Sequence, residues 1–426
     1  MTPRAGILVT GTEVLTGRVV DRNGPWCSER LRELGVEHES TVVVGDRPAD
    51  MLSALGWLRD QGCAVIVTSG GLGPTADDLT AEIVGRFQGR PMVLDSALES
   101  RIASILERLT RRWPDVDLEA IREGNRKQAT VPEGSTILEP VGTAPGLVVP
   151  PGAGEGPTIV VLPGPPRELK PMWETAVDTS AFRDAISGAG EIRQEMLRLF
   201  GIPESEIAET LRAARKDGID LDSLEVTTCM RRGEIEVVTR FDPNNGRAYE
   251  DLSGFIAGRH ADTLYSTDGS SVDVQVAGLL RDSGLRIAVA ESCTGGLLGA
   301  RLSEAPGSSD YFAGGLIVYS NEAKARLADV GEGTLAEFGA VSEEVAAELA
   351  DGAREKLDAD IGVGITGIAG PGGGSDEKPV GLVCFSVCGP EGRIDRRLQL
   401  PGSREDVRDR STTVAMHMIR ALVQGS

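Results

Sequence analysis

The sequence alternates short apolar segments with amphipathic ones, an order that strongly limits the folds open to the chain. An apolar segment at 5–11 precedes a helical pattern at 21–35, and further apolar segments follow at 39–46 and 63–71. Parallel neighbouring strands need a crossover connection, which a helix supplies. Further elements of the same kind are a helix at 48–61, a helix ending near 87 and a strand at 156–164. The order predicts an α/β fold whose parallel sheet is covered by helices on both faces.

The pattern changes in the middle of the chain and then returns. The segment LRLFGIPESEIAETLRAARKDG predicts an amphipathic helix, and SLEVTTCMRRGEIEVVTRF alternates apolar and polar residues as a hairpin does. Strands expected after 285 are at 286–290, 314–320, 360–367 and 382–389, with a helix at 404–424 closing the chain. Because 426 residues exceed what one hydrophobic core holds, we expect a multi-domain α/β protein. Its domains are 1–178, a small α+β module at 179–264, and 265–426.

Composition limits the function classes. A formal charge of -21 argues against general binding to nucleic acid or to an anionic membrane. The sequence has no apolar run of about 18 residues and no signal-peptide pattern at its start. Its six cysteines form no CxxC pair, which is typical of reduced thiols. We therefore expect a cytoplasmic protein that acts on small molecules.

The segment Glu291-Ser292-Cys293-Thr294-Gly295-Gly296 follows an apolar strand pattern and precedes a helical one. A strand that turns into a helix at such residues places small nucleophilic side chains at a helix N-terminus. Unpaired backbone N–H groups there stabilise an anion or a developing oxyanion. The segment offers two nucleophiles, Ser292 and Cys293, with Gly295 and Gly296 as oxyanion donors.

A nucleophilic serine needs a base, and histidine occurs only three times in the chain. His417 lies in an apolar helical stretch, which favours a packed histidine. Lys324 is the alternative, since a lysine beside an apolar site loses its proton near neutral pH and serves a serine. Tyr319 is expected to relay that proton or hold the hydroxyl. Taken singly, such residues are more often helix caps or surface groups. Three loops with polar residues, however, each follow a strand of this domain, and the strand ends of an open α/β sheet converge. Together these loops favour a functional site.

The first domain has a glycine-rich loop, GGLGPTADD, between a strand and a helix. It is neither a Walker A motif nor a dinucleotide fingerprint. Backbone amides of such a turn cradle phosphate, which gives a phosphate site at Gly70, Gly71, Gly73 and Thr75. Asp77 and Asp78 would repel phosphate unless a divalent metal bridges them; the equally weighted alternative is that both are helix N-terminal charges.

Many ordered motifs resemble the CinA (competence/damage-inducible protein A) family. The matching segments of the first part are GTEVLTG, DRNGPWCSERL, VGDR, TSGGLGPTADDLT, GNRKQA, GTAPG and LPGPPRE. Those of the last part are AESCTGG, YSNEAKARL, GAVSEEVA, TGIAGPGGGSDEKPVG and GSREDVR. The resemblance implies a molybdopterin-binding (MoaB/MogA-like) first domain, a KH-like linker and a C-terminal nicotinamide-nucleotide amidase. Two departures, Glu139-Pro140-Val141 and Asp21-Arg22-Asn23, leave the first domain's substrate open.

The amidase that the resemblance implies converts nicotinamide mononucleotide to nicotinic acid mononucleotide and ammonia, in pyridine-nucleotide salvage, without a cofactor. It makes Ser292 the nucleophile, Lys324 the base and Tyr319 a supporting hydroxyl. Arg404, or Arg408, would hold the substrate phosphate. Other substrate-binding positions would be Glu291, Thr294, Gly295, Gly296, Asn321, Thr366 and Gly367. Some family members cleave ADP-ribose in the first domain with a divalent metal. The linker is read as a spacer that binds no nucleic acid, and a homodimer is expected.

Two rival interpretations remain. The chain is a molybdopterin- or nucleotide-binding or scaffold protein whose C-terminal domain is catalytically idle. Alternatively, Cys293 is the nucleophile, since helix N-termini lower thiol pKa values.

Overall fold

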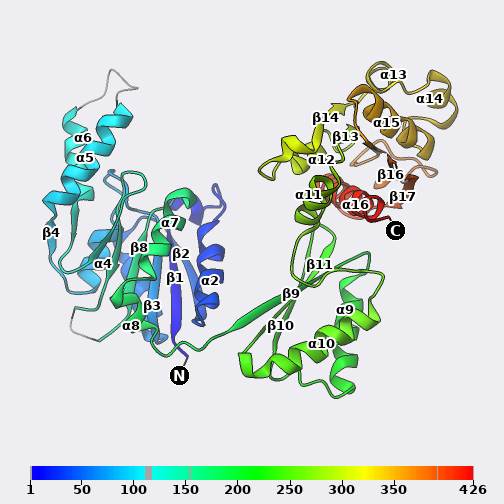
Figure 1. Ribbon diagram of the computed structural model, residues 1–426. Helices are drawn as coiled ribbons and strands as arrows, with labels where there is room; N and C mark the ends of the chain where they lie inside the picture. The colour runs from blue at the N-terminus through cyan, green and yellow to red at the C-terminus, as the bar shows by residue number, and fades with distance from the viewer. Residues whose placement is uncertain (1, 111–117, 153–154, 391, 426) are drawn as a thin grey trace. The chain divides into compact units, whose positions relative to one another are not determined.

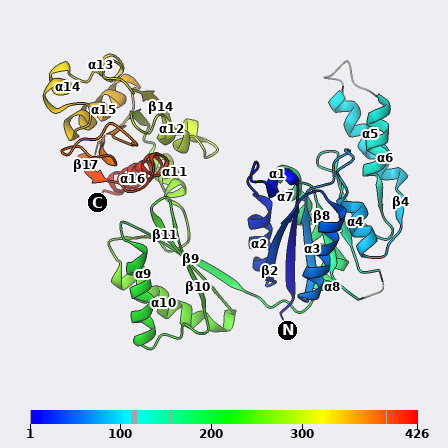
Figure 2. The same ribbon diagram turned by 180° about the vertical axis from the view of Figure 1, so that it is seen from behind.

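The computed structural model describes residues 2–110, 118–152, 155–390 and 392–425. The chain divides into two compact units, Met1–Arg193 with Asp242–Asn244 and Gln194–Phe241 with Asn245–Ser426 (Figures 1 and 2). The second unit holds both the middle module and the C-terminal domain, and each of these has its own hydrophobic core.

The first unit is built on a six-stranded sheet in the order β2-β1-β3-β8-β7-β6. The first four of these strands run parallel, as the sequence predicts, and the last two join antiparallel. Their bounds are β1 (Arg4–Thr10), β2 (Glu37–Val44), β3 (Cys63–Ser69), β6 (Thr136–Leu138), β7 (Gly146–Val149) and β8 (Thr158–Leu162). The parallel strands bring the ends of β1, β3 and β8 to one edge, where the glycine-rich loop begins.

Two hydrophobic cores cover the two faces of this sheet. Ile7 and Val9 of β1 face α2 (Asn23–Glu33), α7 (Pro166–Ala176) and α8 (Ser180–Ala185). Leu8 faces the other way, toward α3 (Pro48–Asp60) and α4 (Thr80–Phe87). Phe182 of α8 is fully buried in the first of these cores. The structure therefore moves the boundary expected at 178 to Arg193.

The segment between 88 and 155 has elements that the sequence pattern did not predict. They are β4 (Met92–Leu94), α5 (Ser96–Thr110), α6 (Leu118–Gln128), β5 (Thr130–Pro132) and the edge strands β6 and β7, as well as the short α1 (Thr12–Leu15) earlier in the chain. Strands of three or four residues are too short to show a period of two, which explains why β4, β5, β6 and β7 were not predicted; it does not explain the omission of the longer helices α5 and α6.

The middle module has the chain order β9-α9-β10-β11-α10-β12 and one four-stranded sheet. Its bounds are β9 (Arg193–Phe200), α9 (Glu204–Lys216), β10 (Glu225–Arg231), β11 (Glu234–Phe241), α10 (Gly246–Arg259) and β12 (Leu264–Ser266). The predicted hairpin is β10–β11. The helix predicted from LRLF onward is wrong in its first part, because these four residues end β9 and bury Leu197 and Leu199. The module continues to Ser266, two residues beyond the expected end.

The C-terminal domain has a five-stranded sheet in the order β14-β13-β15-β16-β17. Its strands are β13 (Ile287–Glu291), β14 (Phe312–Ile317), β15 (Ile361–Gly367), β16 (Leu382–Gly389) and β17 (Gly392–Gln399), the last of which was not predicted. Its helices are α11 (Val272–Ser283), α12 (Leu297–Leu302), α13 (Asn321–Ala328), α14 (Glu332–Phe338), α15 (Glu343–Lys356) and α16 (Arg404–Gln424). Helices α11 and α16 pack on one face of the sheet and α15 on the other.

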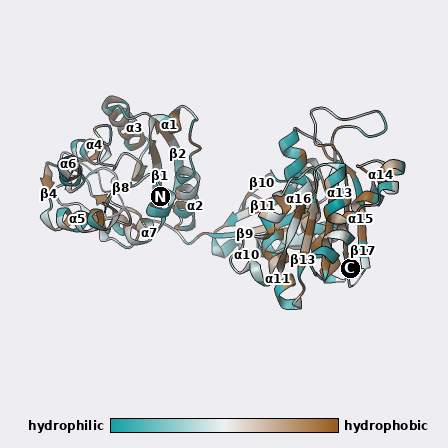
Figure 3. Cartoon of the chain, turned by 90° about the horizontal axis from the view of Figure 1, so that it is seen from above, coloured by the Kyte–Doolittle hydropathy of each residue, from teal (hydrophilic) through white to brown (hydrophobic). Residues whose placement is uncertain are grey.

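Residue size differs between the two faces of this sheet. Val289 and Val363 point toward α11 and α16, whereas Ala288 points toward α15. A Cβ on Gly364 would lie 2.0 Å from the Ala346 carbonyl oxygen of α15, so only glycine permits this close approach. Figure 3 shows the hydrophobic colouring of strands such as β13 within this packing. Across the described ranges, no helix is both long and apolar enough to cross a membrane.

Candidate active site

Three loops of the C-terminal domain begin at the same edge of its sheet, as the sequence predicts. Glu291, the last residue of β13, pairs in register with Ile317 of β14 and with Ile365 of β15. The residues that follow these strands therefore start at one level. The Ser292 amide donates to the Ile365 carbonyl at 2.9 Å, which extends the strand pairing into the turn.

Ser292 and Lys324 are in direct contact. The Lys324 Nζ donates to the Ser292 Oγ at 3.1 Å and to the Val318 carbonyl at 3.0 Å. Lys324 lies one turn into α13, whose N-cap Ser320 accepts from the Ala323 amide, so the helix starts in the orientation that returns this side chain to the end of β13. The predicted nucleophile and base are thus within proton-transfer distance of each other.

The Lys324 side chain is nearly buried, with an exposed fraction of 2%. Burial lowers the pKa of its ammonium group, because a low-dielectric environment disfavours the charged form. Among the described residues, its hydrogen-bond acceptors are the Ser292 hydroxyl and two backbone carbonyls, which are neutral dipoles and not a carboxylate. The site therefore supplies the two conditions that make a lysine a base, desolvation and a bound hydroxyl.

Cys293 faces away from this pair. Its side chain is buried in the core beneath α11 and α16, and burial raises the pKa of its thiol to about 12. A thiol reacts as its thiolate, so both position and ionisation favour Ser292 as the nucleophile.

Glu291 has a structural role, which corrects its expected place among the substrate-binding residues. Its carboxylate accepts from the amides of Gly296 and Leu298 at 3.0 Å and of Gly299 at 2.8 Å. The buried charge is compensated by the N-terminus of α12, where amide donors and the helix dipole favour an anion. The carboxylate fixes the turn, and with an exposed fraction of 1% it does not face solvent.

The same contacts correct the expected oxyanion donors. The Gly296 amide is bound by Glu291, and the Gly295 amide donates to the Ser292 carbonyl at 3.1 Å. Gly295 and Gly296 instead take positive φ angles of 60° and 97°, which let the chain turn from β13 into α12.

Tyr319 and Arg404 form the open side of the site. The Arg404 guanidinium donates to the Tyr319 hydroxyl at 2.9 Å and to the Gly370 carbonyl at 2.7 Å. The Tyr319 side chain is 60% exposed. Its hydroxyl thus contacts Arg404 in this structure, and only its backbone carbonyl contacts Lys324, at 3.4 Å. The proton relay expected of Tyr319 is not present in this geometry.

The remaining predicted residues surround this centre with different roles. Arg408 donates to the carbonyls of Cys293 at 3.2 Å and Thr294 at 2.8 Å, so it clamps the nucleophile turn. Thr366 donates to the Ala340 carbonyl at 2.7 Å, beside Gly367 at the end of β15. Asn321 is exposed at the start of α13. The Thr294 hydroxyl is buried and, among the described residues, has no hydrogen-bond partner.

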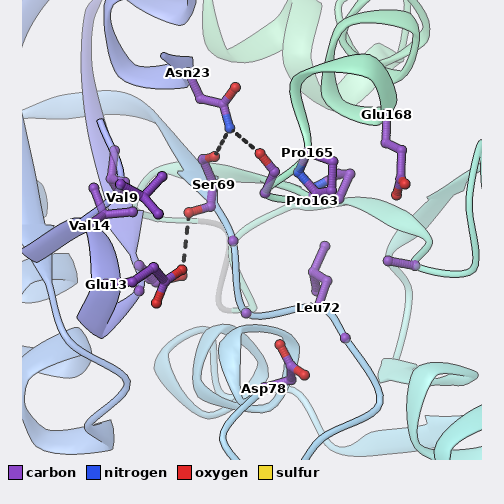
Figure 4. A pocket seen from close by; sticks show the side chains of 18 of the residues that line it. Val9, Glu13, Val14, Asn23, Ser69, Leu72, Asp78, Pro163, Pro165 and Glu168 are labelled. Carbon is purple, nitrogen blue, oxygen red and sulfur yellow. Dashed lines mark hydrogen bonds between the residues drawn. The ribbon is translucent and has the colours of Figure 1, made fainter. Parts of the chain in front are cut away.

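The first unit has a separate cavity of about 920 Å³ at the ends of β1, β3 and β8 (Figure 4). Gly70, Gly71 and Gly73 line it, in agreement with the predicted loop, whereas Thr75 turns away to contact Asp77 and Asp78. The sequence analysis missed Asn23, whose amide donates to the Ser69 hydroxyl at 2.8 Å and the Gly164 carbonyl at 2.6 Å. Its place as the first residue of α2, in the segment Asp21-Arg22-Asn23, was the available indication.

The carboxylates expected to hold a divalent metal are engaged elsewhere. Asp78 accepts from the Thr75 amide at 3.0 Å, and both Asp77 and Asp78 accept from the Thr75 hydroxyl. Within the part of the chain that the structure describes, no group of three or more histidine, cysteine, aspartate or glutamate side chains is arranged to hold a metal ion. These residues do not fit a preformed metal site.

Comparisons with known proteins match both ends of the chain. The family description "CinA C-terminal domain" matches residues 269–423, and "Probable molybdopterin binding domain" matches 6–181. A "CinA-like protein" of Mycobacterium sp. (strain JLS) is 58% identical over 425 residues and covers 100% of both chains. A "CinA-like protein" of Mycobacterium tuberculosis (strain ATCC 25177 / H37Ra) is 55% identical over 426 residues, 99% of this chain and 98% of the relative.

Among solved structures, the competence/damage inducible protein CihA of Agrobacterium tumefaciens is 37% identical, with a TM-score of 0.35; the match covers 37% of this chain and 99% of that one. The full-length likeness to the mycobacterial proteins decides the assignment: this chain belongs to the CinA family.

Proposed function

We propose that the C-terminal domain hydrolyses the carboxamide of nicotinamide mononucleotide, as an enzyme of cytoplasmic pyridine-nucleotide salvage. The observation that carries the reaction type is the 3.1 Å contact between the buried Lys324 Nζ and the Ser292 Oγ. The family resemblance supplies the substrate.

In the first step, neutral Lys324 takes the hydroxyl proton of Ser292 while Oγ bonds to the carboxamide carbon. The carbon–nitrogen bond then breaks, and Lys324 returns the proton to the departing ammonia. In the second step, water attacks the ester, Lys324 accepts its proton, and the carbon–Oγ bond breaks. Oγ takes the proton back, and nicotinic acid mononucleotide leaves.

Arg404 binds the substrate phosphate in this proposal. It lies at the N-terminus of α16, where the helix dipole also favours an anion. Tyr319, bound to the guanidinium, holds it beside the open side of the site.

A second candidate function concerns the first unit. Its cavity is lined by the glycine-rich loop, by two arginines, Arg18 and Arg22, and by six carboxylates, Glu13, Asp21, Asp46, Asp77, Asp78 and Glu168. The loop and the two arginines support binding of a phosphate-bearing ligand, whereas the carboxylates oppose it. We propose that it binds a nucleotide; the cleavage of ADP-ribose that the resemblance implies would need a divalent metal that the described side chains are not arranged to hold in advance.

Replacing either member of the Ser–Lys pair is expected to remove the amidase. Ammonia release from nicotinamide mononucleotide should fall at least about 10³-fold in Ser292→Ala and about 10²- to 10⁴-fold in Lys324→Met. Cys293→Ala is the matched control and should retain most of the rate. Full activity in both variants, or an inert wild type, rejects the proposal.

The reaction should depend on pH through Lys324. Below the pKa of Lys324 the ammonium form has no lone pair for the serine proton, so kcat/KM rises as pH increases through that pKa. Because burial lowers this pKa, the midpoint should lie below the ordinary lysine value of 10.5. The pH profile of ammonia release measures it, and Cys293→Ala should leave the midpoint unchanged. A rate that does not rise with pH anywhere between acidic and alkaline conditions contradicts Lys324 as the base.

Arg404→Gln should raise KM for nicotinamide mononucleotide about 10- to 100-fold, since a hydrogen bond to a charged group is lost. The unphosphorylated nicotinamide riboside should show little change, because it has no group for Arg404 to bind. Arg397→Gln, at an exposed arginine of β17, is the control. Equal effects on the two substrates place the phosphate elsewhere.

The cavity of the first unit is tested with ADP-ribose by calorimetry, with and without added Mg²⁺, and by release of AMP. Arg22→Gln should weaken binding by about 10-fold or more. Arg47→Gln, a surface arginine paired with Asp50, should bind normally. Wild-type protein that does not bind ADP-ribose under either condition removes this candidate.

A further inference from the structure

Helix α16 links the proposed amidase site to the middle module. Its first two turns contribute Arg404 and Arg408 to the site, and its central part contacts strands of the module. His417 lies nine residues beyond Arg408, about 14 Å along the helix. We propose that the middle module is a positioning element for the active site, acting through α16, and not a spacer. This inference rests on the proposed amidase function where it is tested by activity. A second test, by hydrogen exchange, does not depend on that function.

Three strands of the middle sheet converge on His417. The imidazole Nε2 lies 2.7 Å from the carboxylate Oε1 of Glu234, the first residue of β11. The ring stacks on Phe200 of β9, with centroids 3.8 Å apart and planes 7° from parallel. Tyr265 of β12 meets the same ring edge-on at 4.6 Å. One α16 side chain is thus held from three directions.

The His417–Glu234 contact is buried on both sides, with exposed fractions of 7% and 5%. Burial lowers the pKa of His417 and the neighbouring Glu234 opposes that shift. Removing two polar groups from water largely offsets the attraction between them, so such a pair contributes mainly to a defined geometry. It fixes the register of α16 against the middle sheet.

A second contact lies closer to the site. The turn of the β10–β11 hairpin contains Arg232 with a φ of 54°, a conformation that residues other than glycine rarely adopt. Its Nε lies 3.4 Å from the Asp409 carboxylate. Asp409 directly follows Arg408, which holds the carbonyls of Cys293 and Thr294. The hairpin turn therefore borders the residue that clamps the nucleophile turn.

Through these contacts the position of the middle module can affect the position of Ser292. The hairpin and His417 set the position of α16, α16 sets Arg408, and Arg408 holds the two residues after Ser292. Misplacement of a reacting group by about 1 Å lowers a rate up to about 100-fold. Glu234 and His417 are accordingly positioning residues, since neither touches the Ser–Lys pair in the contacts described.

The test compares Glu234→Ala, Glu234→Gln and Glu236→Ala in the full-length protein. Glu236 is the matched control, because it lies on the same strand and makes a buried pair with Arg198 at 2.6 Å, within the module. Glu234→Ala should lower kcat for nicotinamide mononucleotide about 10- to 100-fold. Glu234→Gln, which keeps a hydrogen bond to His417, should recover most of the rate. Glu236→Ala should lower the melting temperature of the module while kcat stays near the wild-type value.

Hydrogen exchange of residues 293–299 gives a readout that does not need the amidase. These amides should exchange faster in Glu234→Ala than in wild type or Glu236→Ala. Should wild type release no ammonia, the proposed function fails, and the exchange result alone decides the positioning role. Unchanged exchange in Glu234→Ala, or an equal increase in Glu236→Ala, overturns the inference.

Discussion

The C-terminal site depends on the carboxylate of Glu291. This buried group receives three amide hydrogen bonds from the start of α12 and so joins the end of β13 to a helix of only six residues. A helix this short has little stability of its own, and a buried carboxylate without partners is costly. Each therefore stabilises the other. Their combination fixes the turn in which Ser292 faces Lys324 and Cys293 enters the core.

Lys324 is the second buried ionisable residue of the site, and its surroundings differ from those of Glu291. The Glu291 carboxylate accepts hydrogen bonds from the N-terminus of a helix. The Lys324 amino group donates to neutral oxygen atoms and to no carboxylate in the contacts described. Burial therefore lowers the pKa of Lys324, which has no carboxylate among its hydrogen-bond partners. Groups that are less well satisfied than their neighbours concentrate at functional sites, which agrees with a lysine that releases its proton.

Much of this arrangement was open to prediction from the sequence. Long apolar strands and glycine turns predict the parallel strands of both α/β sheets, the convergence of three loops and the Ser292–Lys324 pair, but not the antiparallel strands at the sheet edges. The roles of Glu291 and Tyr319 could not be predicted from the sequence, because the type of a residue does not reveal which of several polar neighbours its side chain contacts. A carboxylate that accepts from amides five to eight residues later has no sequence signature. The segment LRLF (197–200) was predicted to be helical because the spacing of its apolar residues fits both a helix and a strand. Its pairing with β12 makes it a strand.

His417 was expected to be a packed histidine, and its burial confirms this. Phe200 and Tyr265, which enclose it, lie on strands of the middle module but pack against the core of the C-terminal domain and complete the surface of α16. In this chain the C-terminal domain consequently does not cover the His417 side of α16 by itself. Excision of residues 269–423 alone would leave an imidazole and the Arg420 guanidinium without the aromatic rings that cover them. A minimal enzyme cut from this protein would need polar replacements along that side of the helix, or would have to retain the β-strands that now shield it.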